Sequence, residues 1–227
     1  RGGRLIADYD SFVIVEVNSE TAKELTESRR GQGRDDYNLI LLNAGAIDTS
    51  TGEKESLSAK SGASDNSSDQ RLHLIQFAGP IKPKWYQSLV ETGVEVVTYI
   101  PNNAYLVYGD SKTLRALAAF AGSSRVVQWD GEYRDEYKGE PGIFDQKEKA
   151  AVGLKAQGAS PTESDLYAIQ LIKAEEVNST TLALIQNSAK EPIKSQYEIL
   201  KFVNIIVNLA PEAIKQISGR PDVVSVQ

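Results

Sequence analysis

Apolar residues recur along this chain in short runs separated by polar turns, and one order of runs occurs three times, the first time only as a half. The clearest block covers residues 71–130. Its runs LHLIQFAG, VEVVTYI, AYLVYG and RVVQW have the length and the β-branched and aromatic content of strands. Two stretches between them place apolar residues three to five positions apart, as amphipathic helices do. The pattern predicts the order βαββαβ for this block.

Turn and capping residues predict where the two helices of this block begin and end. Pro83 suits the first position of a helix, and Gly93 suits the residue after its end. Asp110 or Ser111 can cap the second helix, for which Gly122 is the predicted stop. The Pro-Asn-Asn sequence between VEVVTYI and AYLVYG predicts a tight turn.

A second block, residues 162–227, repeats this order. LYAIQLIKA, IKSQYEIL, FVNIIVNL and DVVSV predict strands, while Ser179 and Pro211 predict the starts of two helices. FVNIIVNL alternates with a period of two, which predicts one buried face and one opposite face. The buried set is Val203, Ile205, Val207 and Leu209, and the opposite set is Phe202, Asn204, Ile206 and Asn208.

Three further segments complete the predicted organisation. Residues 1–48 predict a half unit, ββαβ, from the strand-like runs RLIADY, SFVIVEV and YNLILL and a helical stretch before the last of them. Residues 49–70 are rich in serine, glycine and charge, which predicts a flexible linker. Residues 131–161 predict a polar connector with a few aromatic and apolar side chains that can lie across a neighbouring unit.

These patterns predict an α+β protein of tandem ferredoxin-like βαββαβ units, with antiparallel sheets and helices on one face. Both crossovers of such a unit are right-handed, so both helices cover the same face of the sheet. The opposite face is open unless a partner covers it. Phe202 and Ile206 lie on that face, so it either binds a partner or carries scattered exposed apolar side chains.

Composition limits the possible partners. The chain has 227 residues and a formal net charge of −6, so it lacks the basic surface of a general nucleic-acid binder. It has no cysteine, which excludes disulfides and thiolate metal sites. Its apolar runs are too short to span a bilayer. We therefore expect no nucleic-acid partner and no membrane partner.

Candidate catalytic residues are few. GAIDTSTG places Asp48 at a strand end, as in a subtilisin-type triad, but a triad also needs a histidine and a serine. The only histidine, His73, lies in a predicted strand, and no Gly-Thr-Ser stretch supplies a nucleophile. Both residues are therefore predicted to be structural. The sequence contains no calcium loop and no nucleotide-binding motif, so we expect no catalytic residue, no metal and no cofactor.

RNA binding is a further possibility for βαββαβ units, because aromatic residues on the central strands can stack on bases. AYLVYG and FVNIIVNL lack the basic and aromatic signature of such strands, and the net charge is negative. This function is therefore disfavoured.

The end of the chain carries a family resemblance. NIIVNLAPEAIKQISGRPDVVSV is similar to the end of the inhibitor-type propeptides of subtilisin-like serine proteases, with a strand, a short helix begun by Pro and Glu, and then Pro-x-Val-x-x-Val. The matching positions are Pro211, Glu212, Ile214, Ile217 and Pro221 through Val226. The earlier stretch IQFAGPIKPKWYQSLVETGVEVVTYIPNNAYLVYG resembles repeated N-terminal extensions of larger bacterial proteases of this type.

This resemblance implies a non-catalytic pro-region, bacterial and secreted or extracytoplasmic. It would act as an intramolecular chaperone and inhibitor of a subtilisin-like catalytic domain, in cis or after cleavage. In this family the open sheet face packs on two surface helices of the protease, and the segment after the last strand enters the substrate cleft. We expect the catalytic domain to follow Gln227 directly or after a short tail. The implied contact residues are Phe202, Asn204, Ile206, Asp222, Val223, Val224, Ser225, Val226 and Gln227.

Two other functions stay open. The chain could be a tandem ferredoxin-like ligand-binding module, which often has glycine after the first strand. Gly79 fits this, whereas Ala174 and Glu175 occupy the corresponding place in the last block. It could also be a structural interaction module whose sheet faces pack on one another.

Overall fold

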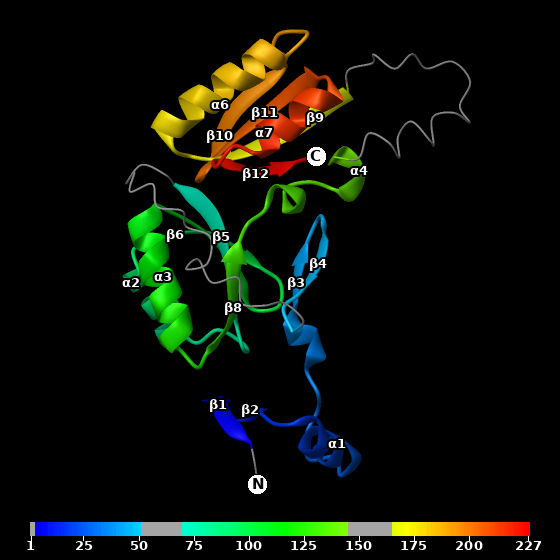
Figure 1. The fold of residues 1–227 in the computed structure, drawn as a ribbon, viewed down its shortest axis with the longest axis vertical. Coiled ribbons are helices and arrows are strands. Elements are labelled where there is room, and N and C mark those ends of the chain that lie inside the picture. Colours follow the sequence, from blue (N-terminus) through cyan, green and yellow to red (C-terminus); the bar gives the residue numbers. More distant parts are fainter. Residues whose placement is uncertain (1–2, 51–69, 145–164) are drawn as a thin grey trace, which may run out of the picture. The chain divides into compact units, whose positions relative to one another are not determined.

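The computed structural model describes residues 3–50, 70–144 and 165–227. These residues form two compact units. The N-terminal unit comprises residues 3–41, 46–50 and 73–132, and the C-terminal unit comprises residues 42–45, 70–72, 133–144 and 165–227. Each unit is α+β, with antiparallel strands and several helices (Figure 1). The linker predicted for residues 49–70 lies almost wholly outside the described residues.

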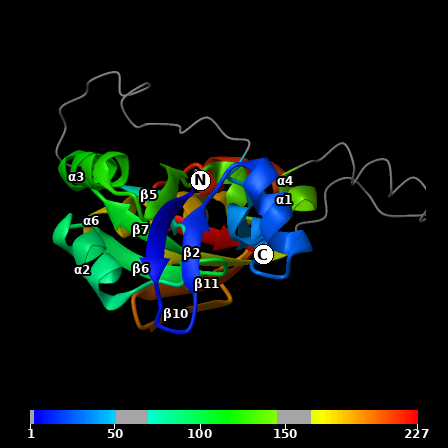
Figure 2. The ribbon, with the colours of Figure 1, turned by 90° about the horizontal axis from the view of Figure 1, so that it is seen from below.

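The N-terminal unit contains the βαββαβ order that the apolar runs of residues 71–130 predict. Its elements are β5 (Arg71–Phe77), α2 (Pro83–Glu91), β6 (Glu95–Ile100), β7 (Ala104–Gly109), α3 (Ser111–Ser123) and β8 (Val127–Glu132). The strand order in the sheet is β6-β7-β5-β8, so the first and third strands are central. Figures 1 and 2 show α2 and α3 side by side along one face of this sheet.

Local sequence explains most of these boundaries. Pro83 is the first helical residue of α2, and Gly93 follows the helix with a φ of 86°, which suits glycine. Asp110 caps α3, because its carboxylate accepts a 2.8 Å hydrogen bond from the backbone N–H of Thr113. The helix runs one residue beyond Gly122, so the predicted stop is one residue too early.

One face of this sheet forms a core with the two helices. Ile75 and Phe77 of β5 pack there with Leu89 of α2 and with Leu114 and Leu117 of α3. All five side chains have at most 2% of their surface exposed. Burial of each such side chain stabilises the fold by about 1.5–3 kcal/mol.

The first 48 residues contain the predicted elements and one further strand. They are β1 (Arg4–Asp8), β2 (Val13–Glu16), α1 (Ser19–Glu27), the 3-10 turn η1 (Asp35–Asn38), β3 (Leu39–Leu42) and the additional β4 (Gly45–Asp48). The strands pair as two separate two-stranded sheets, β1-β2 and β3-β4. The prediction did not anticipate this pairing, because strand partners depend on contacts that the local pattern does not contain.

The β1-β2 hairpin packs against the turn that follows β5. The Tyr9 hydroxyl donates a 2.5 Å hydrogen bond to the carbonyl of Pro80, and the Tyr9 ring lies edge-on to Trp85 at 6.3 Å. Gly79 faces Ile14 so closely that a Cβ atom at residue 79 would lie 2.2 Å from the Ile14 Cδ1 atom. Glycine at this position therefore serves the contact with the hairpin.

The C-terminal unit has the same element order and an equivalent sheet. Its elements are β9 (Asp165–Ile172), α6 (Glu175–Ser188), β10 (Ser195–Ile199), β11 (Phe202–Leu209), α7 (Pro211–Ser218) and β12 (Val223–Val226). The strand order is β10-β11-β9-β12, again with the first and third strands central. Before β9, the short elements η2 (Asp135–Tyr137) and α4 (Pro141–Phe144) belong to this unit.

The predicted start of α6 is wrong. Ser179 lies inside the helix, where its hydroxyl donates to the carbonyl of Glu176, and the N-cap is Ala174. The backbone N–H of Asn178 donates to the Ala174 carbonyl at 2.7 Å, which closes the first turn one turn earlier than expected. Ser179 is a better capping residue than Ala174, so the sequence favours the later start. In the structure, Asn178 stabilises the earlier start from within the helix, because its side chain accepts from the backbone N–H of Ala174.

Candidate binding surface

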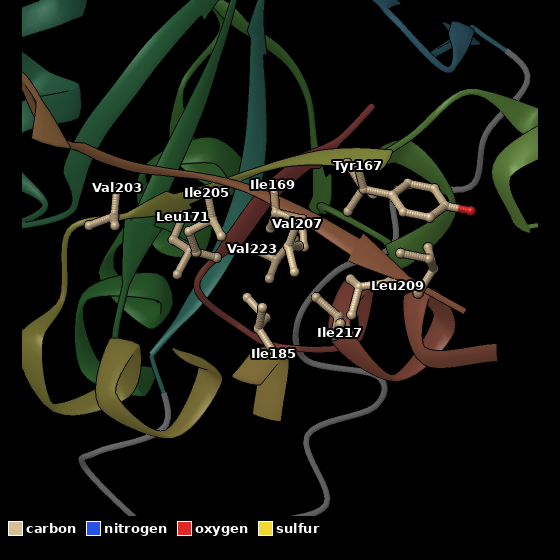
Figure 3. Close-up of a cluster of buried hydrophobic side chains, with 12 residues drawn as sticks. Tyr167, Ile169, Leu171, Ile185, Val203, Ile205, Val207, Leu209, Ile217 and Val223 are labelled. Atoms are coloured by element: carbon tan, nitrogen blue, oxygen red, sulfur yellow. The ribbon is translucent and has the colours of Figure 1, made fainter. Parts of the chain in front are cut away.

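The two faces of the β9–β12 sheet differ as the alternation of FVNIIVNL predicts. Val203, Ile205, Val207 and Leu209 of β11 are buried in the core, which Figure 3 shows. Ile185 of α6 and Ile214 and Ile217 of α7 complete this core, so both helices cover the same face, called here the inner face. The opposite, outer face therefore carries the other set of β11 residues.

Apolar side chains are exposed on the outer face. Phe202 and Ile206 are partly buried and pair in register with Ile172 and Ala168 of β9. Three further apolar residues on the same face have about half of their surface exposed: Leu166 at 55%, Tyr197 at 45% and Ile199 at 55%. Their cross-strand partners on β11 are Asn208, Asn204 and Phe202, which places them on this face. These three residues were not among the predicted contact residues, although the alternation of LYAIQLI, paired with that of β11, identifies Leu166.

A polar pair lies at the centre of the outer face. The side-chain amide of Gln170 on β9 donates a 3.0 Å hydrogen bond to the side-chain oxygen of Asn204 on β11. Both side chains are partly buried and directly opposite one another in the register. The outer face thus has a hydrogen-bonded polar centre with exposed apolar residues around it.

The predicted contact residues fall into two groups. Phe202, Asn204 and Ile206 lie on the outer face, and Ser225 and Gln227 are also at least partly exposed. The remaining predicted residues are buried: Asp222, Val223, Val224 and Val226. A partner could therefore contact side chains of the first group, whereas those of the second group serve the fold. Whether any of them binds a protease stays a prediction.

A bulge in the last strand places Val223 and Val226 in the same core. β12 pairs with β9 through Val223 opposite Leu171 and Val226 opposite Ile169, with Val224 as the extra residue. Without the bulge, the period of two would put residues 223 and 226 on opposite faces. The valine run at the end of this chain is therefore mainly a packing feature.

Asp222 anchors the turn before β12. It has no exposed surface, and its carboxylate accepts hydrogen bonds from the Asn178 amide at 2.8 Å and the Thr181 hydroxyl at 2.6 Å. The Thr181 oxygen in turn accepts from the Nε of Arg220 at 3.0 Å. These bonds attach the end of α7 and the start of β12 to α6, so Asp222 has a structural role.

The predicted connector begins with Gly131 and Glu132, which are the end of β8, and its residues 133–144 lie along the outward edge of β12. The Tyr133 hydroxyl donates to the Val224 carbonyl at 3.1 Å, and the Val226 N–H donates to the Lys138 carbonyl at 2.6 Å. The Tyr133 hydroxyl is protonated at neutral pH and can donate, and burial raises its pKa further above the usual value. The Lys138 ammonium donates to the Ser218 carbonyl at the end of α7. A partner strand could not pair with β12 at these groups, because the chain itself already does.

The residues considered for catalysis lie in structural settings. His73 is fully buried in β5, and its Nε2 lies 3.2 Å from the Asp130 carboxylate on β8. Asp48 accepts hydrogen bonds from the backbone N–H and the hydroxyl of Ser50, which forms a turn after β4. Across the described residues, His, Asp and Glu side chains do not gather into a group of three that could hold a metal ion.

A family model described as a domain of unknown function (DUF8729) matches residues 41–134. The match begins in β3 and ends two residues after β8, so it contains β4 and the complete βαββαβ block of the N-terminal unit. The β9–β12 block lies outside it. No curated protein matches this chain. Of the described helices, none has the length and apolar character to cross a membrane.

Proposed function

We propose that this chain is the non-catalytic pro-region of a bacterial, secreted subtilisin-like serine protease. In this role it assists the folding of the downstream catalytic domain and then inhibits it, without a cofactor of its own. The observation that supports the proposal best is the outer face of the C-terminal unit, where Leu166, Tyr197 and Ile199 are about half exposed beside Phe202 and Ile206. An exposed apolar cluster of this kind marks an interaction surface.

We further propose that both βαββαβ blocks are ferredoxin-like units of a tandem repeat. Three observations support this reading. The strand orders correspond element by element, both helices of each block pack on one sheet face, and the last strand of each block has a bulge at the same place. In β8 the bulge follows Val127, opposite Phe77, and in β12 it follows Val223, opposite Leu171.

The outer face can act in the way this function requires. Docking it on the protease removes apolar surface from water on both partners, and this surface is preformed on a rigid sheet, so little ordering entropy opposes the contact. A protease whose folding barrier is high gains from a partner that binds its native-like state and lowers that barrier. The same contact keeps the folded enzyme inhibited until the chain is degraded.

The test is a titration of a subtilisin-type protease, preferably the one encoded with this chain, with the intact chain and two variants. Ile206→Asp places a charge on the outer face, where we expect inhibition to weaken at least about tenfold because a desolvated carboxylate opposes docking. The matched control is Gln186→Asp, at an exposed position of α6 away from the outer face, and this variant should inhibit like the wild type. Surface substitutions are preferable to deleting the last strand, because Asp222, Val223 and Val226 hold the fold together.

Two results would contradict the proposal. The wild-type chain could stay intact through long exposure to the protease and still not inhibit it. Alternatively, Ile206→Asp and Gln186→Asp could weaken inhibition equally, which would exclude the outer face as the contact. Circular dichroism of each variant before the titration separates loss of binding from loss of folding.

A structural interaction module is the second candidate, and one observation favours it. The sheet of the N-terminal unit binds residues of its own chain on the face opposite its helices, through Gln76 and Gln128. A sheet face of this fold can thus serve assembly rather than recognition of a protease. Absence of inhibition in the titration would favour this candidate.

A further inference from the structure

The outer face of the N-terminal sheet is occupied by a segment that precedes it in the chain. This covering segment comprises residues 37–41 and 46–50. Gln76 lies on the face opposite Ile75 and Phe77 and has no exposed surface. Its amide nitrogen donates to the Tyr37 carbonyl at 2.8 Å, and its amide oxygen accepts from the Thr49 hydroxyl at 2.7 Å. One side chain of the sheet therefore holds both ends of the covering segment.

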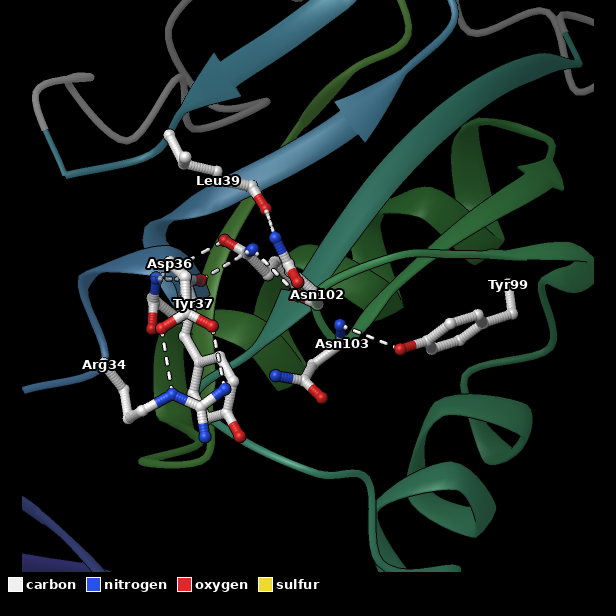
Figure 4. A network of polar contacts seen from close by, with 9 residues as sticks. Arg34, Asp36, Tyr37, Leu39, Tyr99, Asn102 and Asn103 are labelled. Atoms are coloured by element: carbon white, nitrogen blue, oxygen red, sulfur yellow. Dashed lines mark hydrogen bonds and ion pairs between the residues drawn. The ribbon is translucent and has the colours of Figure 1, made fainter. Parts of the chain in front are cut away.

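Two further amides attach the covering segment to the sheet. Gln128 of β8 donates to the side-chain oxygen of Asn38 at 2.9 Å, and Asn102 donates to the Leu39 carbonyl at 2.9 Å. Figure 4 shows the bond from Asn102 to Leu39. Asn102 reaches it from the turn between β6 and β7, where it adopts a φ of 68°, a conformation that asparagine tolerates better than most residues. Side-chain amides of the sheet and of its β6–β7 turn thus hold the end of η1, the start of β3 and the residue after β4.

The C-terminal unit has the same glutamine in the same place. Gln76 pairs with Trp129 of β8 one position before the bulge, and Gln170 pairs with Ser225 of β12 at the corresponding position. Both glutamines follow an isoleucine of the core and precede a buried apolar residue. Gln170, however, is partly exposed and bonds to Asn204 of its own sheet. In the N-terminal unit this sheet face is thus bound to the covering segment. In the C-terminal unit the equivalent face presents exposed apolar residues.

We propose that the covering segment is an intramolecular ligand that occupies the sheet face of the N-terminal unit, so that the chain binds one partner molecule, through the C-terminal unit alone. The bonds of Gln76, Gln128 and Asn102 to this segment support the first part. Residues 41–50 of the segment also fall within the family match that contains the β5–β8 sheet. The number of partner molecules rests on the proposed function, whereas the occupancy of the N-terminal face does not.

Occupancy can be tested without a protease. The test uses the double variant Asn38→Ala/Thr49→Val. Asn38→Ala removes the side-chain oxygen that accepts from Gln128, and Thr49→Val removes the hydroxyl that donates to Gln76. No residue of the sheet is changed. We expect backbone hydrogen exchange of residues 37–50 to become about tenfold faster, because the segment loses two of the side-chain bonds that hold it on the sheet. The matched control is Ser50→Ala, which removes a hydroxyl that bonds to Asp48 within the segment. It should exchange like the wild type.

A synthetic peptide of residues 35–50 provides the direct readout. It should bind the double variant, in which the segment keeps its backbone bonds to Gln76 and Asn102 but not these two side-chain bonds, more tightly than it binds the wild type or Ser50→Ala. If exchange is faster and the peptide binds none of the three proteins, the segment is not a ligand of this face and the proposal is wrong. If the double variant unfolds, the single variants Asn38→Ala and Thr49→Val decide the same question with smaller changes.

The number of binding sites is measured by titrating the catalytic domain into the wild-type chain in a calorimeter. We expect one catalytic domain per chain. Two equivalents would overturn the inference while supporting the proposed function, because both sheet faces would then bind. No binding at all would contradict the proposed function, and the peptide experiment would still decide whether the N-terminal face is occupied.

Discussion

The two βαββαβ blocks of this chain differ less in their folds than in their outer sheet faces. Strand order, helix placement and the bulge of the last strand correspond. On the N-terminal block, Gln76 is fully buried and bonded to the covering segment; on the C-terminal block, the equivalent Gln170 is partly exposed. The difference teaches that the fold leaves this face available, and that neighbouring chain segments decide how it is used.

The sharpest way to separate the two units is to damage one core at a time. Ile75 and Ile169 occupy equivalent core positions with at most 1% exposure, so Ile75→Ala and Ile169→Ala should each cost about 2–5 kcal/mol in the free energy of unfolding. Both tryptophans of the chain, Trp85 and Trp129, lie in the N-terminal unit, so tryptophan fluorescence reports on that unit. In urea titrations, Ile75→Ala should shift the fluorescence transition, and Ile169→Ala should shift only the circular dichroism transition.

Equal shifts of both probes in both variants would contradict this expectation, because each core would then not stabilise its own unit. Val90→Ala in α2 serves as the control, since it removes apolar volume from a side chain that is 40% exposed. It should change neither transition appreciably.

A smaller difference comes from the turn before the last strand. Asp222→Ala removes a buried carboxylate and leaves Asn178 and Thr181 without that partner, which should cost about 3 kcal/mol. Asp222→Asn keeps the shape and one acceptor, so its loss should be smaller. Both tryptophans lie in the N-terminal unit, whose equivalent position holds Val126 and has no such carboxylate. The tryptophan fluorescence transition should therefore stay unchanged in both Asp222 variants. Thermal unfolding of the two variants checks the order; an equal or greater loss for Asp222→Asn would exclude this account.

The outer faces themselves can be compared by one substitution. Gln76→Leu removes the bonds to the covering segment from a fully buried position, and we expect a loss of about 1–3 kcal/mol. Gln170→Leu, at the equivalent position, loses one partly exposed bond and should cost less than about 1 kcal/mol. Urea unfolding measures both. Similar losses would show that the covering segment contributes little to stability.

The smallest expected effect concerns helix caps. Asp110 caps α3, and the hydrogen bond from the Thr113 N–H, followed by that from the Thr113 hydroxyl, lowers the pKa of its carboxyl group. Because the native-state pKa is lowered, the cap stabilises the fold fully above the unfolded-state value of about 3.9 and loses this effect as the pH falls through the native-state pKa. Asp110→Ala should therefore cost about 1 kcal/mol at pH 7 and less near pH 3.

The matching helix of the C-terminal unit sharpens this test. α7 begins at Pro211 after Ala210, whose side chain cannot accept a hydrogen bond. Ala210→Gly should therefore show the same small change in stability at both pH values. A loss at Asp110→Ala that does not depend on pH would mean that the carboxylate charge is not what stabilises the start of α3.

The candidate site could be predicted only in part. The alternation of β11 correctly placed Phe202, Asn204 and Ile206 opposite the core. It could not show that Val223 and Val226 both reach the core, because a bulge changes the period of two and has no clear signal in DVVSV. Tyr197 and Ile199 were missed because their face depends on the register between β10 and β11.

The sequence by itself determined the elements of the two βαββαβ blocks and their order, because apolar spacing, proline, glycine and capping residues act within a few positions along the chain. Only the tertiary structure decided which strands pair, where the last strands bulge and which sheet face is covered. The covering segment depends on contacts such as that between Asn38 and Gln128, which are separated by 90 residues. Such contacts form only after the sheet exists, since neither partner carries a local signal for the other.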